Sequence, residues 1–226
     1  MRTLDKTDEV DRLKLNGAYE RNSDRPTAHL DESYSTPNDA GLELNFYVLT
    51  AVVVSADARD SLRDGIRVIA DGRNWHTRNV FHEQHGPEMV RNMLGYLCEG
   101  DEISLVSKST EIDDSDPNAE EARRACLEQL LCALQGGVPN HGPCDLAVLE
   151  KRKDFAQNNR DLWVYRQAIK SGLIKDSMEV AQVCPSVENL LWLPDTVCYA
   201  VRRNITDSKG KSENLLAEIE PKVHWL

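Results

Sequence analysis

Residues 27–33, Thr-Ala-His-Leu-Asp-Glu-Ser, are the stretch of sequence on which the interpretation of the fold depends. They predict a short strand that ends in charge, because Asp31 and Glu32 directly follow Leu30. Successive side chains of a strand point to opposite faces, so only one of these two carboxylates can point to a given face. Charged groups at the end of a buried strand are rarely left without partners. The pair is therefore the first candidate functional feature.

The elements that follow alternate in type. Residues 45–55 (NFYVLTAVVVS) are rich in β-branched and aromatic side chains and predict a buried strand. Residues 56–100 have apolar side chains at helical spacing and predict a helical insertion. The remaining elements are expected as strand, helix, strand, helix, strand and helix, at residues 102–109, 118–135, 144–150, 160–171, 177–184 and 187–205.

Without the insertion, this order is three strands followed by alternating helices and strands. Three antiparallel strands followed by parallel ones, each reached through a helix, predict an α/β fold with a mixed five-stranded sheet and helices on both faces. This is the element order of the ribonuclease-H-like fold, here with a helical insertion between strands 2 and 3. We expect one domain at residues 27–206, with its insertion at about 56–100, an N-terminal extension at 1–26 and a C-terminal tail at 207–226.

The overall charge limits the classes of partner. The 226-residue chain has a formal net charge of -11, whereas proteins that coat nucleic acid are usually basic. A metal-dependent phosphodiesterase is compatible with this acidity, because a bound cation or a basic cluster such as 151–153 or 202–203 inverts the local field. Nucleic acid thus stays open as a partner without support from the overall charge. A protein partner or a homo-oligomer is the alternative.

The sequence predicts a cytoplasmic protein without membrane contact. No apolar run approaches the roughly 18–20 residues of a membrane-spanning helix. Residues 1–12 lack the apolar core of a secretory signal. The six cysteines show no CxxC or zinc-type spacing, so they are expected to be free, buried thiols.

Two further carboxylates fall where a metal site would need them. In a two-metal phosphodiesterase, divalent ions stabilise the attacking and the leaving oxygen, and Mg²⁺ prefers hard oxygen ligands. Glu150 closes one predicted strand, and Asp195 follows Pro194 at the start of the last helix. Alone, the former is typical of a solvated strand end and the latter of ordinary helix-dipole chemistry. Together with Asp31 they predict a site for Mg²⁺ or Mn²⁺.

The chain from residue 30 onward resembles the DUF3800 family. Residues 30–33 (LDES) and the apolar run 47–54 (YVLTAVVV) are similar to its opening, a strand ending in Asp-Glu-Ser before an apolar strand. Residues 190–203 (LLWLPDTVCYAVRR) are similar to its closing helix. Tyr34 stands where the family usually has glycine, and Pro194 where it usually has alanine. The resemblance covers about residues 28–205 and implies a ribonuclease-H-like fold, with the Asp-Glu pair and the closing Asp as the presumed metal site.

A histidine-rich segment lies in the middle of the chain. The pairs Trp75-His76 and His82-Glu83 are loosely similar to the family's middle histidine motif. Histidine can transfer protons near neutral pH, although loop histidines also serve as simple hydrogen-bonding groups. We expect His76 or His82, with Glu83, to border the site, and Glu32 or Glu83 to orient the attacking water. The helical acid of ribonucleases H has no unique counterpart, and its candidates are Glu120, Glu121 and Glu128.

Two functions are compatible with these features. The first is a divalent-metal-dependent nuclease or phosphodiesterase, with Asp31, Glu150 and Asp195 as metal ligands. The second is a non-catalytic DUF3800-type scaffold or partner-binding module in a mobile-element or defence context. The acidic composition and the N-terminal extension favour the second, and the coincidence of three carboxylates favours the first.

Overall fold

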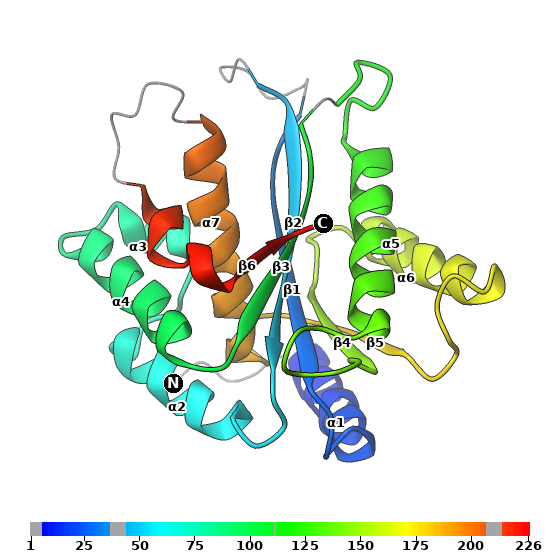
Figure 1. The fold of residues 1–226 in the computed structure, drawn as a ribbon, viewed down its shortest axis with the longest axis horizontal. Coiled ribbons are helices and arrows are strands. Elements are labelled where there is room, and N and C mark those ends of the chain that lie inside the picture. Colours follow the sequence, from blue (N-terminus) through cyan, green and yellow to red (C-terminus); the bar gives the residue numbers. More distant parts are fainter. Residues whose placement is uncertain (1–5, 37–43, 111, 207–213) are drawn as a thin grey trace.

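A six-stranded mixed sheet forms the centre of the protein, as a computed structural model covering residues 6–36, 44–110, 112–206 and 214–226 describes it (Figure 1). The strand order is β5-β4-β1-β2-β3-β6. The strands are β1 Thr27–Ser35, β2 Phe46–Val54, β3 Ile103–Ser109, β4 Leu146–Glu150, β5 Glu179–Val183 and β6 Val223–Trp225.

Strand direction confirms the predicted ribonuclease-H-like arrangement. The first three strands pair antiparallel, β1 with β2 and β2 with β3. Strand β4 then pairs parallel with β1, and β5 pairs parallel with β4. All nine residues of β2 are buried, because helices cover this central strand on both faces. The continuous apolar run that predicted this strand is the expected signature of such burial.

The prediction of five strands was wrong by one. Strand β6 comes from the expected C-terminal tail and pairs parallel with β3, which would otherwise be an edge strand. The amide of Leu226 continues this pairing by donating to the carbonyl of Val106 at 3.0 Å. Residues 207–213 of the expected tail lie outside the described ranges. The sequence signal failed because three residues are too few to establish an alternating pattern.

Helices cover both faces of the sheet (Figure 1). One face carries α7 together with α2, α3 and α4, which form the expected insertion between β2 and β3, and the other face carries α5 and α6. No helix in the described ranges is long and apolar enough to cross a membrane. The six cysteines, all within those ranges, are free thiols, three of them buried. The α-helices are α1 Lys6–Arg21, α2 Arg59–Ile69, α3 Thr77–Phe81, α4 Gly86–Glu99, α5 Glu120–Gly136, α6 Phe155–Lys170 and α7 Trp192–Thr206, and the 3₁₀ turns are Asn189–Leu191, Leu215–Glu218 and Glu220–Lys222.

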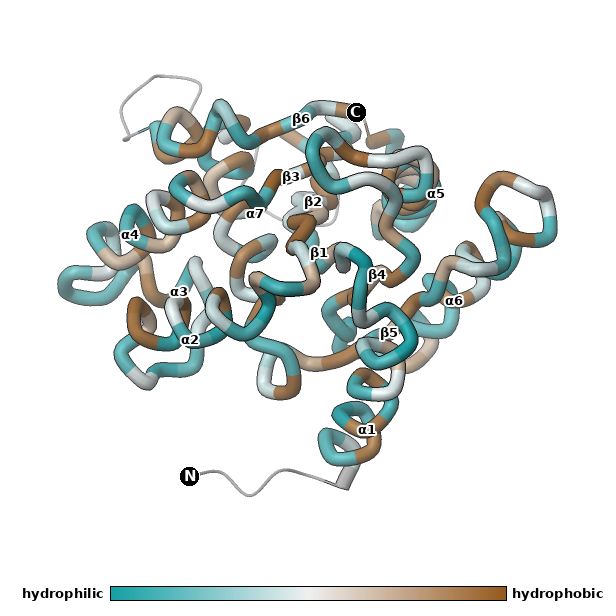
Figure 2. Tube along the Cα trace, turned by 60° about the horizontal axis from the view of Figure 1, so that its bottom comes forward, coloured by the Kyte–Doolittle hydropathy of each residue, from teal (hydrophilic) through white to brown (hydrophobic). Residues whose placement is uncertain are grey.

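Most of the expected N-terminal extension is a helix packed on the sheet. Figure 2 shows α1 beside β5. Its apolar residues Leu15 and Ala18 are buried in a cluster with side chains of β4 and β5. A polar contact adds to this packing, because the Tyr19 hydroxyl donates to Glu188 at 2.7 Å and lies 2.9 Å from Nε2 of the buried His29. Helix α1 is therefore held by both apolar and polar contacts.

Replacing Tyr19 with phenylalanine removes the shared hydroxyl of this network. The buried Glu188 and His29 then each lose a partner, so we expect Tyr19→Phe to lower the free energy of unfolding by about 1–3 kcal/mol. Urea denaturation measures this change. Tyr34→Phe is the matched control, because Tyr34 is partly exposed and its hydroxyl makes no hydrogen bond among the described residues. Equal stability of the two variants would contradict a role of Tyr19 in holding α1.

Candidate metal site

The sheet register brings two of the predicted carboxylates to the same face. The parallel pairing of β1 with β4 ends at Leu30 opposite Leu149, so Asp31 and Glu150 are the next residues on neighbouring strands. Leu30 and Leu149 belong to the core cluster under α5 and α6. Because side chains alternate, Asp31 and Glu150 point to the other face, which α7 covers. Asp195, in the first turn of α7, approaches from that side.

These three carboxylates line one cavity of about 440 Å³. His76 and Glu32 also line it, as do the basic residues of the turn after β4. The cavity thus gathers five of the seven predicted site residues. Its lining is completed by Tyr34, Trp75, Lys151, Arg152, Lys153, Gln157, Pro185, Leu191 and Trp192.

Like charges surround Asp31, which is only 8 % exposed to solvent. Burial, followed by the charges of Glu150, Asp195 and Glu32, raises the pKa of Asp31 well above its usual range. Burial and the charges of Asp195 and Glu32 likewise raise the pKa of Glu150 to about 7. The carboxylates of this cluster therefore repel one another, and protonation relieves the repulsion. A bound cation would relieve it in the same way.

Asp195 is fixed by residues that begin the short helix α3. Its Oδ2 accepts hydrogen bonds from the backbone amide of Thr77 at 2.7 Å and from the Thr77 hydroxyl at 2.9 Å. The Thr77 hydroxyl accepts in turn from the indole of Trp75 at 2.8 Å. The other oxygen, Oδ1, lies 3.6 Å from Nδ1 of His76. This arrangement orients the carboxylate and leaves Oδ1 for further contacts.

His76 lies at the rim of the cavity with its side chain 62 % exposed. Its contact with Asp195, strengthened by the charges of Asp195 and Glu150, raises the pKa of the imidazole. A histidine with a raised pKa holds its proton more tightly and can still exchange it. His76 is thus placed to exchange protons at the edge of the carboxylate cluster.

Glu32 differs from Asp31 because it is charge-compensated. Its Oε2 pairs with the buried Arg123 at 2.8 Å, and Oε1 lies 3.9 Å from Nε of Arg152. Arg123 also binds Asp161 with two hydrogen bonds of 2.6 Å and donates to the hydroxyl of Tyr47. Glu32 therefore belongs to a buried ion network on the α5 side of the sheet, although it also reaches the cavity wall. Its expected role of orienting water would have to compete with these partners.

Two predicted residues are not brought to the cavity. Glu83 pairs with Arg73 at 2.7 Å on the surface, and His82 follows the last residue of α3, with its ring against Phe81. Neither lines the cavity. The expectation that they border the site was wrong, because α3 turns the chain away from Asp195 directly after Thr77.

The three glutamates that were candidates for the helical acid lie outside the cavity as well. Glu120 pairs with Arg152 at 2.8 Å and with Arg160 at 3.4 Å. Glu121 and Glu128 lie at 2.8 and 4.0 Å from Arg124. All three thus face basic side chains of α5, α6 or the turn after β4 rather than the carboxylate cavity.

The donor set suits a hard divalent cation, although it is not closed around one. Carboxylate oxygens are the ligands that Mg²⁺ and Mn²⁺ prefer, and the repulsion at Asp31 and Glu150 is the electrostatic condition that a cation relieves. Within the described ranges, no three or more His, Cys, Asp or Glu side chains are already grouped as a metal centre. Binding would therefore draw the carboxylates together and displace their protons.

Sequence reasoning missed the residues that support the site. Thr77 follows the histidine that was noticed, but nothing in the sequence indicates that its amide and hydroxyl meet Asp195. Arg123 and Asp161 occupy separate helices and are both buried. A charged residue at an apolar position of a helical pattern is the only signal that could have identified them. Such a position suggests a buried pair without naming the partner.

Neutralising Glu150 should stabilise the metal-free protein at high pH. Its pKa of about 7 in the folded state exceeds the value near 4.5 in the unfolded chain, so the folded state holds the proton more tightly. The contribution of this tighter proton binding to the free energy of unfolding is fully present below pH 4.5 and is lost as the pH rises through 7. We expect Glu150→Gln to raise the free energy of unfolding by about 1–3 kcal/mol at pH 8 and by less at pH 5. Urea denaturation in EDTA measures both values.

The control for this change is Glu121→Gln, since Glu121 is exposed in a surface pair with Arg124. It should change stability by less than about 1 kcal/mol at either pH. A Glu150→Gln variant that is less stable than the parent chain at pH 8 would contradict the inferred repulsion between Glu150 and its neighbouring carboxylates.

Removing Arg123 should be strongly destabilising. Its side chain is 2 % exposed, and its loss leaves Glu32 and Asp161 buried without their main counter-charge. We expect Arg123→Met to cost about 3–5 kcal/mol of stability in urea denaturation. The adjacent Arg124→Met removes an exposed cation and should cost less than about 1 kcal/mol. Similar losses in both variants would show that Arg123 contributes through helix α5 rather than through its ion network.

Comparisons with known proteins give partial structural alignments at low sequence identity. No protein-family model matches the chain, and no curated protein matches it. Among solved structures, ribonuclease H2 from Pyrococcus horikoshii OT3 aligns with a TM-score of 0.49 and 13% identity, over 81% of this chain and 74% of that one. Bst-RNase HIII in complex with Mn²⁺ aligns with a TM-score of 0.45 and 11% identity, over 81% of this chain and 54% of that one. At these values no residue role is transferred from either protein.

Proposed function

We propose that this chain is a divalent-metal-dependent phosphodiesterase that acts on nucleic acid, with a ribonuclease-H-like carboxylate site. One observation carries the proposal: Asp31, Glu150 and Asp195 come from three separate elements and line a single cavity. Burial and the charges of neighbouring carboxylates raise the pKa values of Asp31 and Glu150, and neither forms an ion pair with a described cation, whereas Glu32 pairs with Arg123. The resemblance to the DUF3800 family is part of the same proposal.

The proposed ligands of the metal are Asp31, Glu150 and Asp195. When bound, Mg²⁺ or Mn²⁺ would supply Lewis-acid stabilisation of the reacting phosphate and activate water. Thr77 holds Asp195 through Oδ2, so that Oδ1 stays directed at the cavity rim. His76, whose Nδ1 lies 3.6 Å from Oδ1, would give a proton to the leaving oxygen from the rim of the cavity.

The turn after β4 supplies groups for the substrate phosphates. Lys151, Arg152 and Lys153 all line the carboxylate cavity. Lys151 pairs with Asp11 and Arg152 with Glu120, whereas Lys153 makes no ion pair with any described residue. Lys153 is therefore the cation most available to a phosphate. Its position beside the carboxylates would let it orient the chain that is cut.

A non-catalytic scaffold is the second candidate, and one observation favours it. The described residues hold no ready-made group of three metal-binding side chains. If the carboxylates simply stay protonated, the site would be a remnant of the fold without activity. Metal binding separates the two candidates.

A metal titration followed by differential scanning fluorimetry tests the proposal. Millimolar Mg²⁺ or Mn²⁺ should raise the melting temperature at pH 8 and raise it less at pH 6, because Glu150 must lose its proton to bind metal. Asp31→Asn and Asp195→Asn should abolish this shift. They should also abolish cleavage of labelled RNA and DNA oligonucleotides, with the metal-free melting temperature of Asp31→Asn unchanged or higher.

The matched control is Asp64→Asn, which removes a carboxylate that is 81 % exposed on α2. It should keep the full metal response. Metal stabilisation that persists in Asp31→Asn would refute the ligand assignment, and its absence in the parent chain would favour the scaffold.

A further inference from the structure

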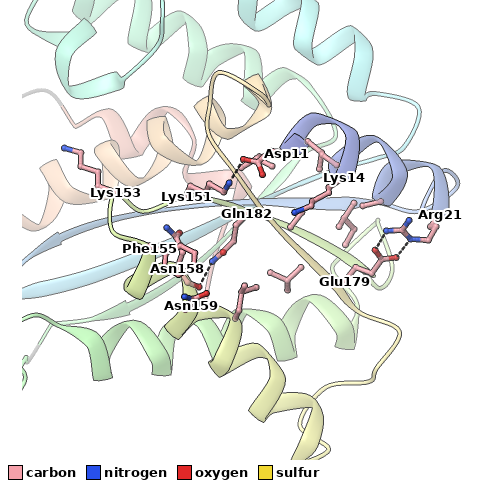
Figure 3. Close-up of a pocket in the computed structure, with 17 residues that line it drawn as sticks. Asp11, Lys14, Arg21, Lys151, Lys153, Phe155, Asn158, Asn159, Glu179 and Gln182 are labelled. Carbon is pink, nitrogen blue, oxygen red and sulfur yellow. Dashed lines mark hydrogen bonds and ion pairs between the residues drawn. The ribbon is translucent and has the colours of Figure 1, made fainter. Parts of the chain in front are cut away.

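A second cavity, of about 540 Å³, runs along the outer strand β5 between α1 and α6 (Figure 3). Strand β5 is the last strand of the sheet at this end, so one of its edges has no strand partner within the described ranges. Consecutive residues 179–183 line the cavity, which means that it follows the strand edge rather than one face of the sheet. We call this cavity the α1–α6 groove.

The groove is basic in an acidic chain. Four cations line it, Lys14, Arg21, Lys151 and Lys153, against two carboxylates, Asp11 and Glu179. The chain as a whole carries a formal charge of -11, so this local excess of positive charge is opposite in sign to the rest of the protein. Such a patch attracts a polyanion even when the net charge does not.

Ion pairs leave two of the groove cations available. Asp11 pairs with Lys151, and Glu179 pairs with Arg21 at 2.6 Å. Lys14 and Lys153 have no carboxylate partner among the described residues, and both are exposed. In Figure 3, Lys14 lies between the two ion pairs, while Lys153 lies at the opposite end of the groove from Arg21. A bound polyanion could therefore contact unpaired cations at two separated points.

The groove continues into the carboxylate cavity. Lys151 and Lys153 line both cavities, because the turn after β4 separates them. Phe155 stands just beyond this turn, lines the groove and is 80 % exposed. Asn158 and Asn159 follow on the same helix and add amide groups to the wall. Cations that follow a backbone, together with an exposed aromatic ring for base stacking, are the elements of a single-strand nucleic-acid site.

We propose that the α1–α6 groove binds a single-stranded segment of nucleic acid and leads it to the carboxylate cavity. Lys14 and Lys153 would contact phosphates, and Phe155 would stack on a base. This inference rests on the proposed function for its direction, since the strand would lead to the site that cuts it. A groove of this volume between two helices accommodates a short single strand rather than a duplex.

An acidic peptide is the competing occupant, because the open edge of β5 could pair with an extended peptide. Two observations favour nucleic acid. The groove shares residues with a cavity suited to phosphodiester chemistry, and its exposed ring lies at the junction rather than along the strand edge. Neither feature is required by a peptide that pairs through its backbone.

Fluorescence anisotropy with a labelled 12-nucleotide single strand tests the groove. The measurement uses the full chain in EDTA, so that binding is read without metal-dependent cleavage. The double variant Lys14→Glu/Lys153→Glu should weaken binding at least tenfold and reduce the slope of log affinity against log salt by about 1.4, which corresponds to two lost phosphate contacts. Phe155→Ala should weaken binding by about tenfold.

The matched control is Lys170→Glu/Lys175→Glu, which makes the same change of charge at exposed positions outside the groove. It should bind within about twofold of the parent chain. Melting temperatures check that all variants fold, and a 12-residue oligoglutamate serves as the competing polyanion.

Three results would overturn the proposal: no binding by the parent chain, equal weakening in both double variants, or equal affinity for oligoglutamate. The last result would indicate an acidic peptide as the occupant. A failure of the proposed catalytic function appears separately, as a missing metal response or missing cleavage, and leaves the anisotropy result intact.

Discussion

The parallel register of β1 against β4 is the constraint on which the candidate site depends. It places Asp31, in the middle of β1, beside Glu150, the last residue of β4, and directs both to the face under α7. Two carboxylates at such close quarters and largely out of water repel each other strongly, and a proton or a cation is needed to relieve this repulsion. The raised pKa values of both residues express that cost. The fold thus creates a position where a positive charge is needed.

The adjacent residues Asp31 and Glu32 have opposite electrostatic surroundings, because their side chains point to opposite faces of the sheet. Glu32 points toward α5, where Arg123, supported by Asp161, neutralises it. Asp31 points toward α7, where the charges of Glu150, Asp195 and Glu32 act on it and no side chain in the described ranges forms an ion pair with it. A carboxylate that serves only the fold is most simply stabilised by an arginine, as Glu32 is. Under the proposed function, Asp31 would therefore be the metal ligand and Glu32 the structural member of the pair.

The sequence predicts those features that depend on local pattern. The burial of β2 follows from its apolar run. The expected parallel pairing of β1 with β4 brings Asp31 beside Glu150, although β1 does not end at the charged pair and continues to Ser35. Contacts between distant segments, such as that of Thr77 with Asp195, have no such rule and stayed hidden. Glu83 was expected at the site because it is close to His76 in the sequence. The five-residue helix α3 lies between them, and Glu83 pairs with Arg73 on the surface instead.

The acidity of the chain and a nucleic-acid substrate are compatible because charge acts locally. The Debye length at physiological salt is about 8 Å, so a polyanion at the α1–α6 groove is influenced mainly by the groove itself. Helix α1 is central to this arrangement. It covers apolar side chains of β4 and β5 and at the same time supplies Lys14, and its Asp11 holds Lys151 between the two cavities. A segment that sequence analysis treats as an extension is thus one wall of the groove, and the remaining acidic surface would keep nucleic acid away from the rest of the molecule.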